Sequence, residues 1–195
     1  PVIEHIIERF TSVGVSNFIL TVNYKGRIMK AFFEELQPDY SVEFIDELSP
    51  LGTAGSLKLL EDRIDRPFFV TNCDIIVKED YSDIYNFHLK KQYDITLVAS
   101  MKNFTLPYGT CEINEKGTLK IIHEKPEYDF LINTGLYVVN PEVLKLIPED
   151  RLYNITDLIK DANDQGKIIG VYPVDDESWI DVGQWADYQK AVEKL

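Results

Sequence analysis

Short apolar runs alternate with stretches of helical spacing through the first half of the chain, and this alternation limits the folds open to it. The apolar runs, typical of buried strands, lie at residues 18–22, 42–45, 67–71 and 95–100. The stretches of helical spacing lie at residues 3–10, 26–36, 54–60 and 81–91. Strands that alternate with helices predict a parallel sheet covered by helices on both faces.

The rhythm changes after Met101, where strands follow one another with little helix between them. We expect strands at residues 108–113, 118–123, 131–139, 168–172 and around Trp179, and helices at residues 155–163 and 184–193. No internal repeat, low-complexity segment or linker divides the chain. We therefore predict one α/β domain over residues 1–195, Rossmann-like, with three α/β/α layers and a mostly parallel, partly mixed central sheet.

The chain is strongly acidic, and this limits the ligands that it can take. It carries 33 Asp and Glu against 20 Lys and Arg, a formal net charge of −13 over 195 residues. Nucleic acids and anionic membranes are bound chiefly through Lys and Arg, so we expect neither as a partner. An anionic ligand such as a nucleotide would need its charge cancelled locally, and a divalent metal held by carboxylates would do this.

The cysteines indicate the compartment. Cys73 and Cys111 are too few for a disulfide framework and have no metal-ligand spacing. No apolar run approaches the length of a membrane span, and no signal peptide opens the chain. These features indicate a cytoplasmic protein. Pro1 leads straight into a helical pattern, which we interpret as a start within a domain.

Three segments follow predicted strands at the sheet end where open α/β folds bind ligands: the loop after Ile45, residues 72–74 and the segment near Lys125. The first contains the hexapeptide LGTAGS at residues 51–56. Its glycines allow a ligand to approach the backbone closely, and its N–H groups open a helix. An ordinary glycine turn with a Thr or Ser cap explains the same hexapeptide. Its glycine spacing matches neither a Walker loop nor the dinucleotide fingerprint.

Two aspartates stand in positions that suit a metal ion. Asp74 ends an apolar strand, and Asp181 lies in the segment WIDVG, so each carboxylate is a candidate ligand for Mg²⁺. A turn-forming Asp after a strand and an N-cap Asp before the final helix are the structural alternatives. Cys73, next to Asp74, is expected to be a small buried residue and not a nucleophile.

Two polar segments further on suit a phosphorylated ligand. Lys125 is a candidate phosphate contact and Glu124 a candidate contact of sugar hydroxyls, and Pro126 directs the chain out of the sheet. A solvated charge pair at a strand end is the alternative. Asn133 and Gly135 interrupt an apolar strand, which indicates either close approach of a ligand or a β-bulge.

In their order along the chain, LGTAGS, NCD, PYG, EKP, NTGLYV and WIDVG resemble the motifs of the sugar-1-phosphate nucleotidyltransferase family. The likeness covers essentially all of residues 1–195 and is strongest toward the mannose-1-phosphate guanylyltransferase branch. It implies a fold of the nucleotide-diphospho-sugar transferase type. It also implies an enzyme that joins a nucleoside triphosphate, GTP favoured, to a sugar 1-phosphate and releases pyrophosphate. Mg²⁺ is the implied cofactor, and association into a homo-oligomer stays open.

The resemblance also implies roles for individual residues. Asp74 and Asp181 match the magnesium ligands and Lys125 matches the residue that holds the sugar phosphate, so these three are the predicted catalytic residues. The predicted nucleotide-binding residues are Gly52, Thr53, Ala54 and Gly55. The predicted sugar-binding residues are Gly109, Glu124, Asn133 and Gly135.

Two departures from the family pattern leave alternatives open. Cys73 stands where the family usually has glycine, a change expected to affect packing. The family's N-terminal glycine-rich loop, with its Arg and Lys, has no counterpart in these residues, so the domain would lack its first strand and that loop. A non-catalytic, regulatory relative that binds a nucleotide-sugar is one alternative. A nucleotide-sugar-dependent glycosyltransferase is another, although no Asp-x-Asp motif occurs. The base also stays open among GTP, CTP, UTP and dTTP.

Overall fold

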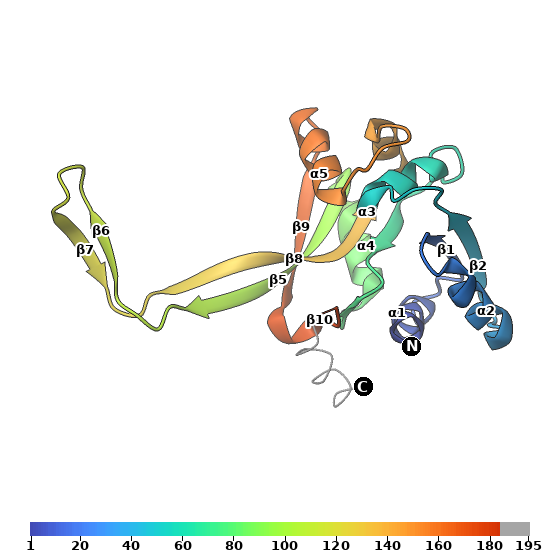
Figure 1. Cartoon of the computed structure of the whole chain (residues 1–195), viewed down its shortest axis with the longest axis horizontal. Coiled ribbons are helices and arrows are strands. Elements are labelled where there is room, and N and C mark those ends of the chain that lie inside the picture. Colours follow the sequence, from blue (N-terminus) through green and yellow to red (C-terminus); the bar gives the residue numbers. More distant parts are fainter. Residues whose placement is uncertain (184–195) are drawn as a thin grey trace.

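Helices and strands alternate along the chain up to β5, except that β4 follows β3 directly, largely as the spacing of the apolar residues predicts (Figure 1). The structure is a computed structural model, and it describes residues 1–183. In that part of the chain the helices are α1 (Val2–Thr11), α2 (Gly26–Leu36), α3 (Gly52–Gly55), α4 (Tyr81–Lys91) and α5 (Ile155–Asp164), with the 3₁₀ helices η1 (Ser56–Leu60), η2 (Pro141–Leu146) and η3 (Asp176–Ser178). The strands are β1 (Asn17–Val22), β2 (Ser41–Asp46), β3 (Phe68–Thr71), β4 (Ile75–Val77), β5 (Ile95–Thr105), β6 (Thr110–Ile113), β7 (Leu119–His123), β8 (Glu127–Val139), β9 (Ile169–Asp175) and β10 (Trp179–Asp181).

The central sheet has the strand order β3-β8-β5-β9. β5 runs parallel to β9, and both β3 and β5 run antiparallel to β8, so β3, β5 and β9 share one direction. β8 runs against them because it is the return strand of a long excursion that leaves the body through β5. The predicted α/β fold with a mixed central sheet is therefore confirmed.

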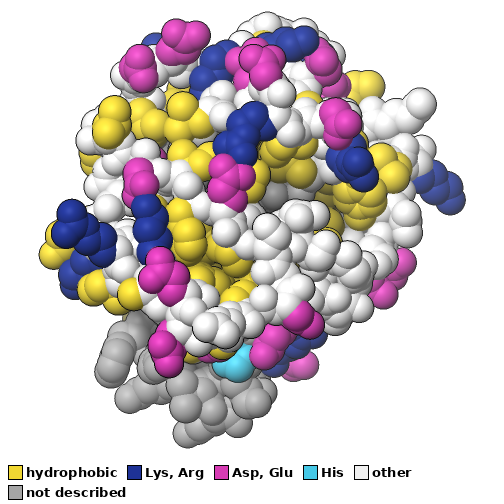
Figure 2. All heavy atoms as spheres, turned by 90° about the vertical axis from the view of Figure 1, so that its right-hand side faces the viewer, with side chains coloured by type: hydrophobic (Ala, Val, Ile, Leu, Met, Phe, Trp, Pro, Cys, Tyr) yellow, Lys and Arg dark blue, Asp and Glu magenta, His cyan; other side chains and the backbone are white. Residues whose placement is uncertain are grey.

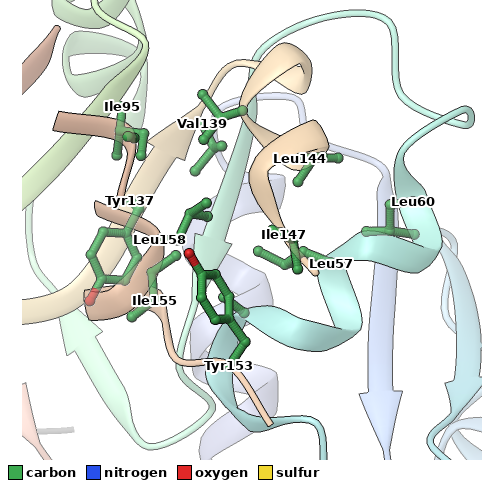
Figure 3. Close-up of a cluster of buried hydrophobic side chains, with 13 residues drawn as sticks. Leu57, Leu60, Ile95, Tyr137, Val139, Leu144, Ile147, Tyr153, Ile155 and Leu158 are labelled. Carbon is green, nitrogen blue, oxygen red and sulfur yellow. The ribbon is translucent and has the colours of Figure 1, made fainter. Parts of the chain in front are cut away.

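Two hydrophobic cores lie on opposite faces of this sheet. Successive residues of a strand point to opposite faces. Tyr137 and Val139 of β8 accordingly pack with residues of α3, η1, η2 and α5, whereas Leu136 and Val138 pack with residues of α1 and α4. Figure 3 shows the first of these cores, to which the segment before α5 contributes Tyr153. Helices therefore cover both faces, as the three-layer prediction requires.

β1 and β2 form a separate parallel pair beside the central sheet. Phe10 of α1 packs against Phe18 of β1 and against Phe69 of β3, with ring centroids 6.1 and 5.2 Å away. Within residues 1–183, however, β1 pairs only with β2 and β3 pairs only with β8, so each keeps one edge without a partner strand. Figure 2 faces the side of the molecule on which β1 and β2 lie, and it shows hydrophobic side chains exposed in a hollow near the centre.

Residues 101–131, here called the arm, extend away from the body of the molecule (Figure 1). The stem of the arm is the outer part of the β5–β8 ladder, in which Met101 pairs with Leu131 and Thr105 pairs with Glu127. Its tip is the antiparallel hairpin of β6 and β7. The strands predicted at 108–113 and 118–123 are this hairpin, but the sequence pattern does not indicate that it projects.

The remaining differences from the predicted elements are local. The helix predicted at 54–60 is split into α3 and η1, whose first part contains two glycines that disfavour a regular helix. β4 has three residues, too few for a period to be recognised. The helix predicted at 184–193 lies outside the described residues. No helix within residues 1–183 is long and apolar enough to cross a membrane.

Candidate functional site

Asp74 and Asp181, far apart in the sequence, lie side by side in the structure. β4 starts directly after Asp74 and pairs antiparallel with β10, so that Asp181 is opposite Ile75. The backbone N–H of Val182 donates to the carbonyl oxygen of Asp74 at 2.8 Å. A Cβ placed on Gly183 would lie 2.9 Å from Asp74 Oδ2 and 3.1 Å from Asp181 Oδ1. Both carboxylates therefore border the same small region of the surface.

This pair of carboxylates has the composition of a magnesium site that is shared with a substrate. Mg²⁺ is usually bound through one or two carboxylates, substrate phosphates and water, and seldom by a complete cage of protein ligands. No group of three or more His, Cys, Asp or Glu suited to a metal occurs within residues 1–183. Asp74 is exposed and Asp181 is half-buried, so a phosphate oxygen can approach the pair. The donor set therefore fits Mg²⁺ with a phosphorylated ligand.

The NTG segment lies next to this pair. The backbone N–H of Asn72 donates to the carbonyl oxygen of Gly135 at 3.0 Å. Gly135 has φ +88°, and a Cβ there would lie 2.9 Å from Asn72 Nδ2, so a larger residue would strain the backbone and displace the Asn72 side chain. The Asn133 side chain accepts from the Gly135 N–H at 3.0 Å and donates to the Tyr137 hydroxyl at 2.7 Å. Both functions of this amide are thus engaged within the chain.

The backbone of the NTG segment is also irregular, as a glycine inside a strand predicts. The register between β5 and β8 shifts between Leu97 and Ala99, across from this segment. A shift of this kind marks a β-bulge, which bends a strand and redirects its side chains. The register shift agrees with the structural alternative for this segment, a bulge or similar irregularity, and the sugar-contact role of Asn133 and Gly135 stays a prediction.

Residues 52–55, the predicted nucleotide loop, are held by the segment before α5. The N–H groups of Ala54 and Gly55 both donate to the carbonyl oxygen of Tyr153 at 3.0 Å, and the N–H of Tyr153 donates to the carbonyl oxygen of Leu51 at 2.8 Å. Gly52 has φ +79°, and a Cβ there would lie 2.7 Å from the same Tyr153 oxygen. The two glycines of the loop therefore permit contact with the backbone at residues 151–153, and two of its N–H groups are already paired.

Tyr153 is itself fixed from two sides. Its ring is buried in the core shown in Figure 3, and its hydroxyl donates to Asp161 Oδ2 at 2.6 Å. Burial, followed by the hydrogen bond to Asp161, raises the pKa of this hydroxyl well above its ordinary value, so it stays protonated. The loop thus rests on a residue that is anchored to α5. The sequence carries no signal for this contact, because it joins segments distant in the chain.

The side chain of Thr53 caps the start of α5. A capping Thr is the structural alternative to ligand binding that the sequence analysis gives for the hexapeptide at residues 51–56. The Ile155 N–H, in the first turn of α5, donates to Thr53 Oγ1 at 2.9 Å. The Asn154 N–H donates to Asp157 Oδ2 at 3.1 Å, as part of a capping box. The side chain of Thr53 therefore joins the predicted nucleotide loop to the start of α5.

We expect Thr53→Ala to lower the free energy of unfolding by about 1 kcal/mol, because the Ile155 N–H loses its acceptor. Thr53→Ser keeps the hydroxyl and should retain most of the stability. Urea unfolding of the three proteins measures the difference. Equal stability of the alanine and serine variants would show that the hydrogen bond contributes nothing.

Gly109, Glu124 and Lys125 lie on the arm, apart from the aspartates. A Cβ on Gly109 would lie 3.2 Å from Glu124 Oε2, so the PYG and EKP motifs are neighbours, as the resemblance implies. Lys125 is exposed, with φ +44°. Each strand residue advances the chain by about 3.3 Å, so Glu127 lies roughly 20 Å along β8 from Asn133. In Figure 1 the tip of the arm is remote from β4 and β10. The predicted grouping of Lys125 with Asp74 and Asp181 is therefore absent from this conformation within a single chain.

Cys73 differs from its prediction. It is exposed and not buried, because it lies in the turn between β3 and β4. Partial desolvation of its sulfur, and then the neighbouring Asp74 carboxylate, raise the pKa of its thiol. The thiol therefore stays protonated at neutral pH, which agrees with the prediction that Cys73 is not a nucleophile.

Known proteins match this chain over almost all of its length. The family model described as "Nucleotidyl transferase" matches residues 1–195. The mannose-1-phosphate guanyltransferase of Yarrowia lipolytica is 35% identical over 200 residues, which cover 96% of this chain and 53% of that protein. The mannose-1-phosphate guanyltransferase of Saccharomyces cerevisiae is 34% identical over 206 residues, which cover 96% of this chain and 54% of that protein. The chain thus spans about half the length of these curated relatives.

A solved structure shares the fold. HddC from Yersinia pseudotuberculosis superimposes with a TM-score of 0.73 and 26% identity, covering 97% of this chain and 83% of that chain. The same protein complexed with GMP-PN gives a TM-score of 0.75 at 24% identity and covers 100% of this chain and 85% of that chain.

Proposed function

The chain belongs to the nucleotidyl transferase family, and on this premise we propose that it is the nucleotidyltransferase domain of an enzyme that joins a nucleoside triphosphate to a sugar 1-phosphate. The products are a nucleotide-sugar and pyrophosphate. The observation that carries this proposal is the convergence of Asp74 and Asp181 on the region beside Gly183. Two adjacent carboxylates repel each other at short distance, and a bound divalent cation would cancel this repulsion.

The chemistry requires positioning and charge neutralisation more than covalent help. An oxygen of the sugar phosphate attacks the α-phosphorus in line, and the bond from that phosphorus to the bridging oxygen of the β-phosphate breaks. The electron pair of this bond leaves with pyrophosphate. Mg²⁺ on Asp74 and Asp181 would neutralise phosphate charge when bound. Residues 52–55 would hold the base and ribose, Lys125 the sugar phosphate, and Glu124, Gly109, Asn133 and Gly135 the sugar.

GTP is the donor that we favour, and a mannose phosphate is the corresponding acceptor. The support is the LGTAG sequence of the loop, together with the activity named for the fungal relatives. The exposed, unpaired thiols of Cys73 and Cys111 support a reducing cytoplasm as the setting.

The domain also has room for one further strand, between β1 and β3. Each has one unpaired edge within the described residues, and all four side chains of β3 are only half-buried. Unpaired strand edges in the middle of a fold leave backbone polar groups unsatisfied. We therefore propose that residues outside 1–195 supply this strand and, with it, the glycine-rich loop typical of the family.

Pyrophosphate release by the whole protein tests the proposal. The assay combines GTP, CTP, UTP or dTTP with a panel of sugar 1-phosphates, with and without Mg²⁺. We expect Mg²⁺-dependent release with one preferred pair, GTP and mannose 1-phosphate. Preference for another triphosphate would reject the guanylyl assignment alone. Absence of release with every pair, from a folded protein that binds a nucleotide-sugar, would favour a regulatory relative.

A further inference from the structure

The strand that carries Asp181 has little support of its own. β10 has three residues, and within residues 1–183 it pairs only with β4, which also has three residues. A pair of strands this small is at best marginally stable by itself. The position of the Asp181 carboxylate therefore depends on the contacts that hold β10 from outside the pair.

The turn before β10 is the place where the chain leaves the central sheet. β9 pairs with β5 as far as Asp175, which lies opposite Met101, and the chain then turns through η3 into β10 (Figure 1). Asp175, Asp176 and Glu177 place three carboxylates in succession at this turn, and like charges repel each other. A cation between η3 and the central sheet would therefore stabilise the turn.

Lys102 supplies such a cation. It follows Met101 on β5, one residue beyond the end of the β5–β9 ladder. Its Nζ lies 3.2 Å from Asp176 Oδ1, at the start of η3, and 4.9 Å from the centre of the Trp179 ring, at the start of β10. The face of an indole ring attracts an ammonium group. One side chain of the central sheet thus contacts both ends of the turn.

Trp179 connects Lys102 to Asp181 along β10. Its ring packs on the hydrophobic core that α1 and α4 cover, and its indole N–H has no hydrogen-bond partner among residues 1–183. In this part of the chain, packing and the contact with Lys102 therefore hold the ring. Trp179 and Asp181 are alternate residues of β10, so their side chains leave the strand on the same side. A shift of the ring would accordingly shift the carboxylate.

An ordinary surface ion pair is the alternative interpretation of Lys102. The side chains of Lys102 and Asp176 are 33% and 56% exposed, and ion pairs of this kind contribute little to global stability. A positioning role does not require a large contribution to stability. β10 can shift locally while the rest of the domain stays folded, and each molecule in the shifted state would bind a metal ion less tightly.

We propose that Lys102 is a positioning residue for the metal site, which holds η3 and β10 so that the Asp181 carboxylate stays beside that of Asp74. This inference rests on the proposed function, since it takes these two carboxylates as the ligands of Mg²⁺. The charge of Lys102 alone has the opposite effect, because a cation near the site repels a divalent metal ion. Loss of Lys102 therefore weakens metal binding if it positions Asp181, and strengthens metal binding if only its charge matters.

Binding of Mn²⁺ to the whole protein without substrates measures this effect apart from turnover. Mn²⁺ takes the same oxygen ligands as Mg²⁺, and the electron paramagnetic resonance signal of free Mn²⁺ gives the dissociation constant. We expect Lys102→Met to raise this constant by about three- to tenfold, which corresponds to about 0.7–1.4 kcal/mol. Lys102→Arg keeps a cation that can pair with Asp176 and lie over Trp179, so its constant should stay within about twofold of the wild-type value.

Lys145→Met is the matched control. Lys145 forms an exposed ion pair with Glu142 at 2.6 Å on η2, an element that contributes no residue to the aspartate pair. Its substitution removes the same charge from the chain and should leave the Mn²⁺ dissociation constant within about twofold of the wild-type value. Urea unfolding of both methionine variants checks that global stability is retained.

Turnover separates a positioning role from a general loss of folded enzyme. For Lys102→Met, the half-saturating Mg²⁺ concentration for pyrophosphate release should rise by the same factor as the Mn²⁺ constant. The kcat at saturating Mg²⁺ should return close to the wild-type value, because excess metal restores occupancy. A loss of kcat at every Mg²⁺ concentration, with an unchanged half-saturating concentration, would indicate a merely structural role and overturn the proposal.

An unchanged or lower Mn²⁺ dissociation constant in Lys102→Met would also overturn the inference, even if the whole protein releases pyrophosphate. Wild-type Mn²⁺ binding that Asp181→Ala does not weaken would overturn it as well. The proposed function fails on a different result. A protein whose Mn²⁺ binding depends on Asp181 and Lys102, but which releases no pyrophosphate with any substrate pair, would count against the reaction alone.

Discussion

Asp181→Ala is expected to lower kcat/KM for pyrophosphate release by roughly 100- to 1,000-fold, which corresponds to about 3–4 kcal/mol of transition-state stabilisation. Asp181 is one of two carboxylates beside Gly183, and a metal ion held by Asp74 alone would neutralise phosphate charge less effectively. Initial rates of the whole protein over a series of Mg²⁺ concentrations measure the effect. The half-saturating Mg²⁺ concentration should rise along with the loss of rate.

The fold should tolerate this substitution. The side chain of Asp181 is half-buried, and the structure shows for it one hydrogen bond, from the Gly183 N–H at 2.9 Å. Loss of that bond costs about 1 kcal/mol, and removal of one of two neighbouring negative charges offsets part of this cost. Asp164→Ala, at the exposed end of α5, is the matched control and should keep full activity. Turnover by Asp181→Ala equal to that of the control would remove Asp181 from the mechanism.

Much of this site could be predicted from residue type and position alone. Asp74 follows a continuous apolar run, so its place at a strand end was available from the sequence, and the short strand that includes Asp181 was expected around Trp179. Their contact across β4 and β10 could not be predicted, because β4 is too short to give a period and strand pairing is a non-local property. The family motifs indicated the convergence, and the pairing supplies its physical cause.

Two further features escaped prediction for related reasons. The hold of Tyr153 on residues 52–55 depends on backbone groups, which every residue possesses, so no side-chain pattern marks it. The alternation in the arm indicates strands and their faces, but a period of two does not say whether a hairpin packs on the body or projects from it.

Gly52→Ala is expected to lower the free energy of unfolding by about 3 kcal/mol. Two causes contribute to this loss, and the same substitution at Gly166 separates them. The first is the backbone, since φ +79° costs a residue with a Cβ about 1–2 kcal/mol. The second is a collision, because the new Cβ would lie 2.7 Å from the Tyr153 carbonyl oxygen and 3.0 Å from Asn154 Oδ1. The Tyr153 oxygen belongs to backbone that also accepts from Ala54 and Gly55, so it cannot move without loss of those bonds.

Gly166→Ala isolates the first cause. Gly166 has the same φ of +79°, but a Cβ there would meet nothing within 4 Å, so its alanine variant should lose only the backbone contribution of about 1 kcal/mol. Urea unfolding of both variants then gives the collision as a difference of about 2 kcal/mol. Because the collision pushes the loop away from residues 151–155, Gly52→Ala should also raise the KM for the nucleotide while Gly166→Ala leaves it unchanged. Equal losses of stability in the two variants would mean that the loop yields freely and that Tyr153 does not hold it in place.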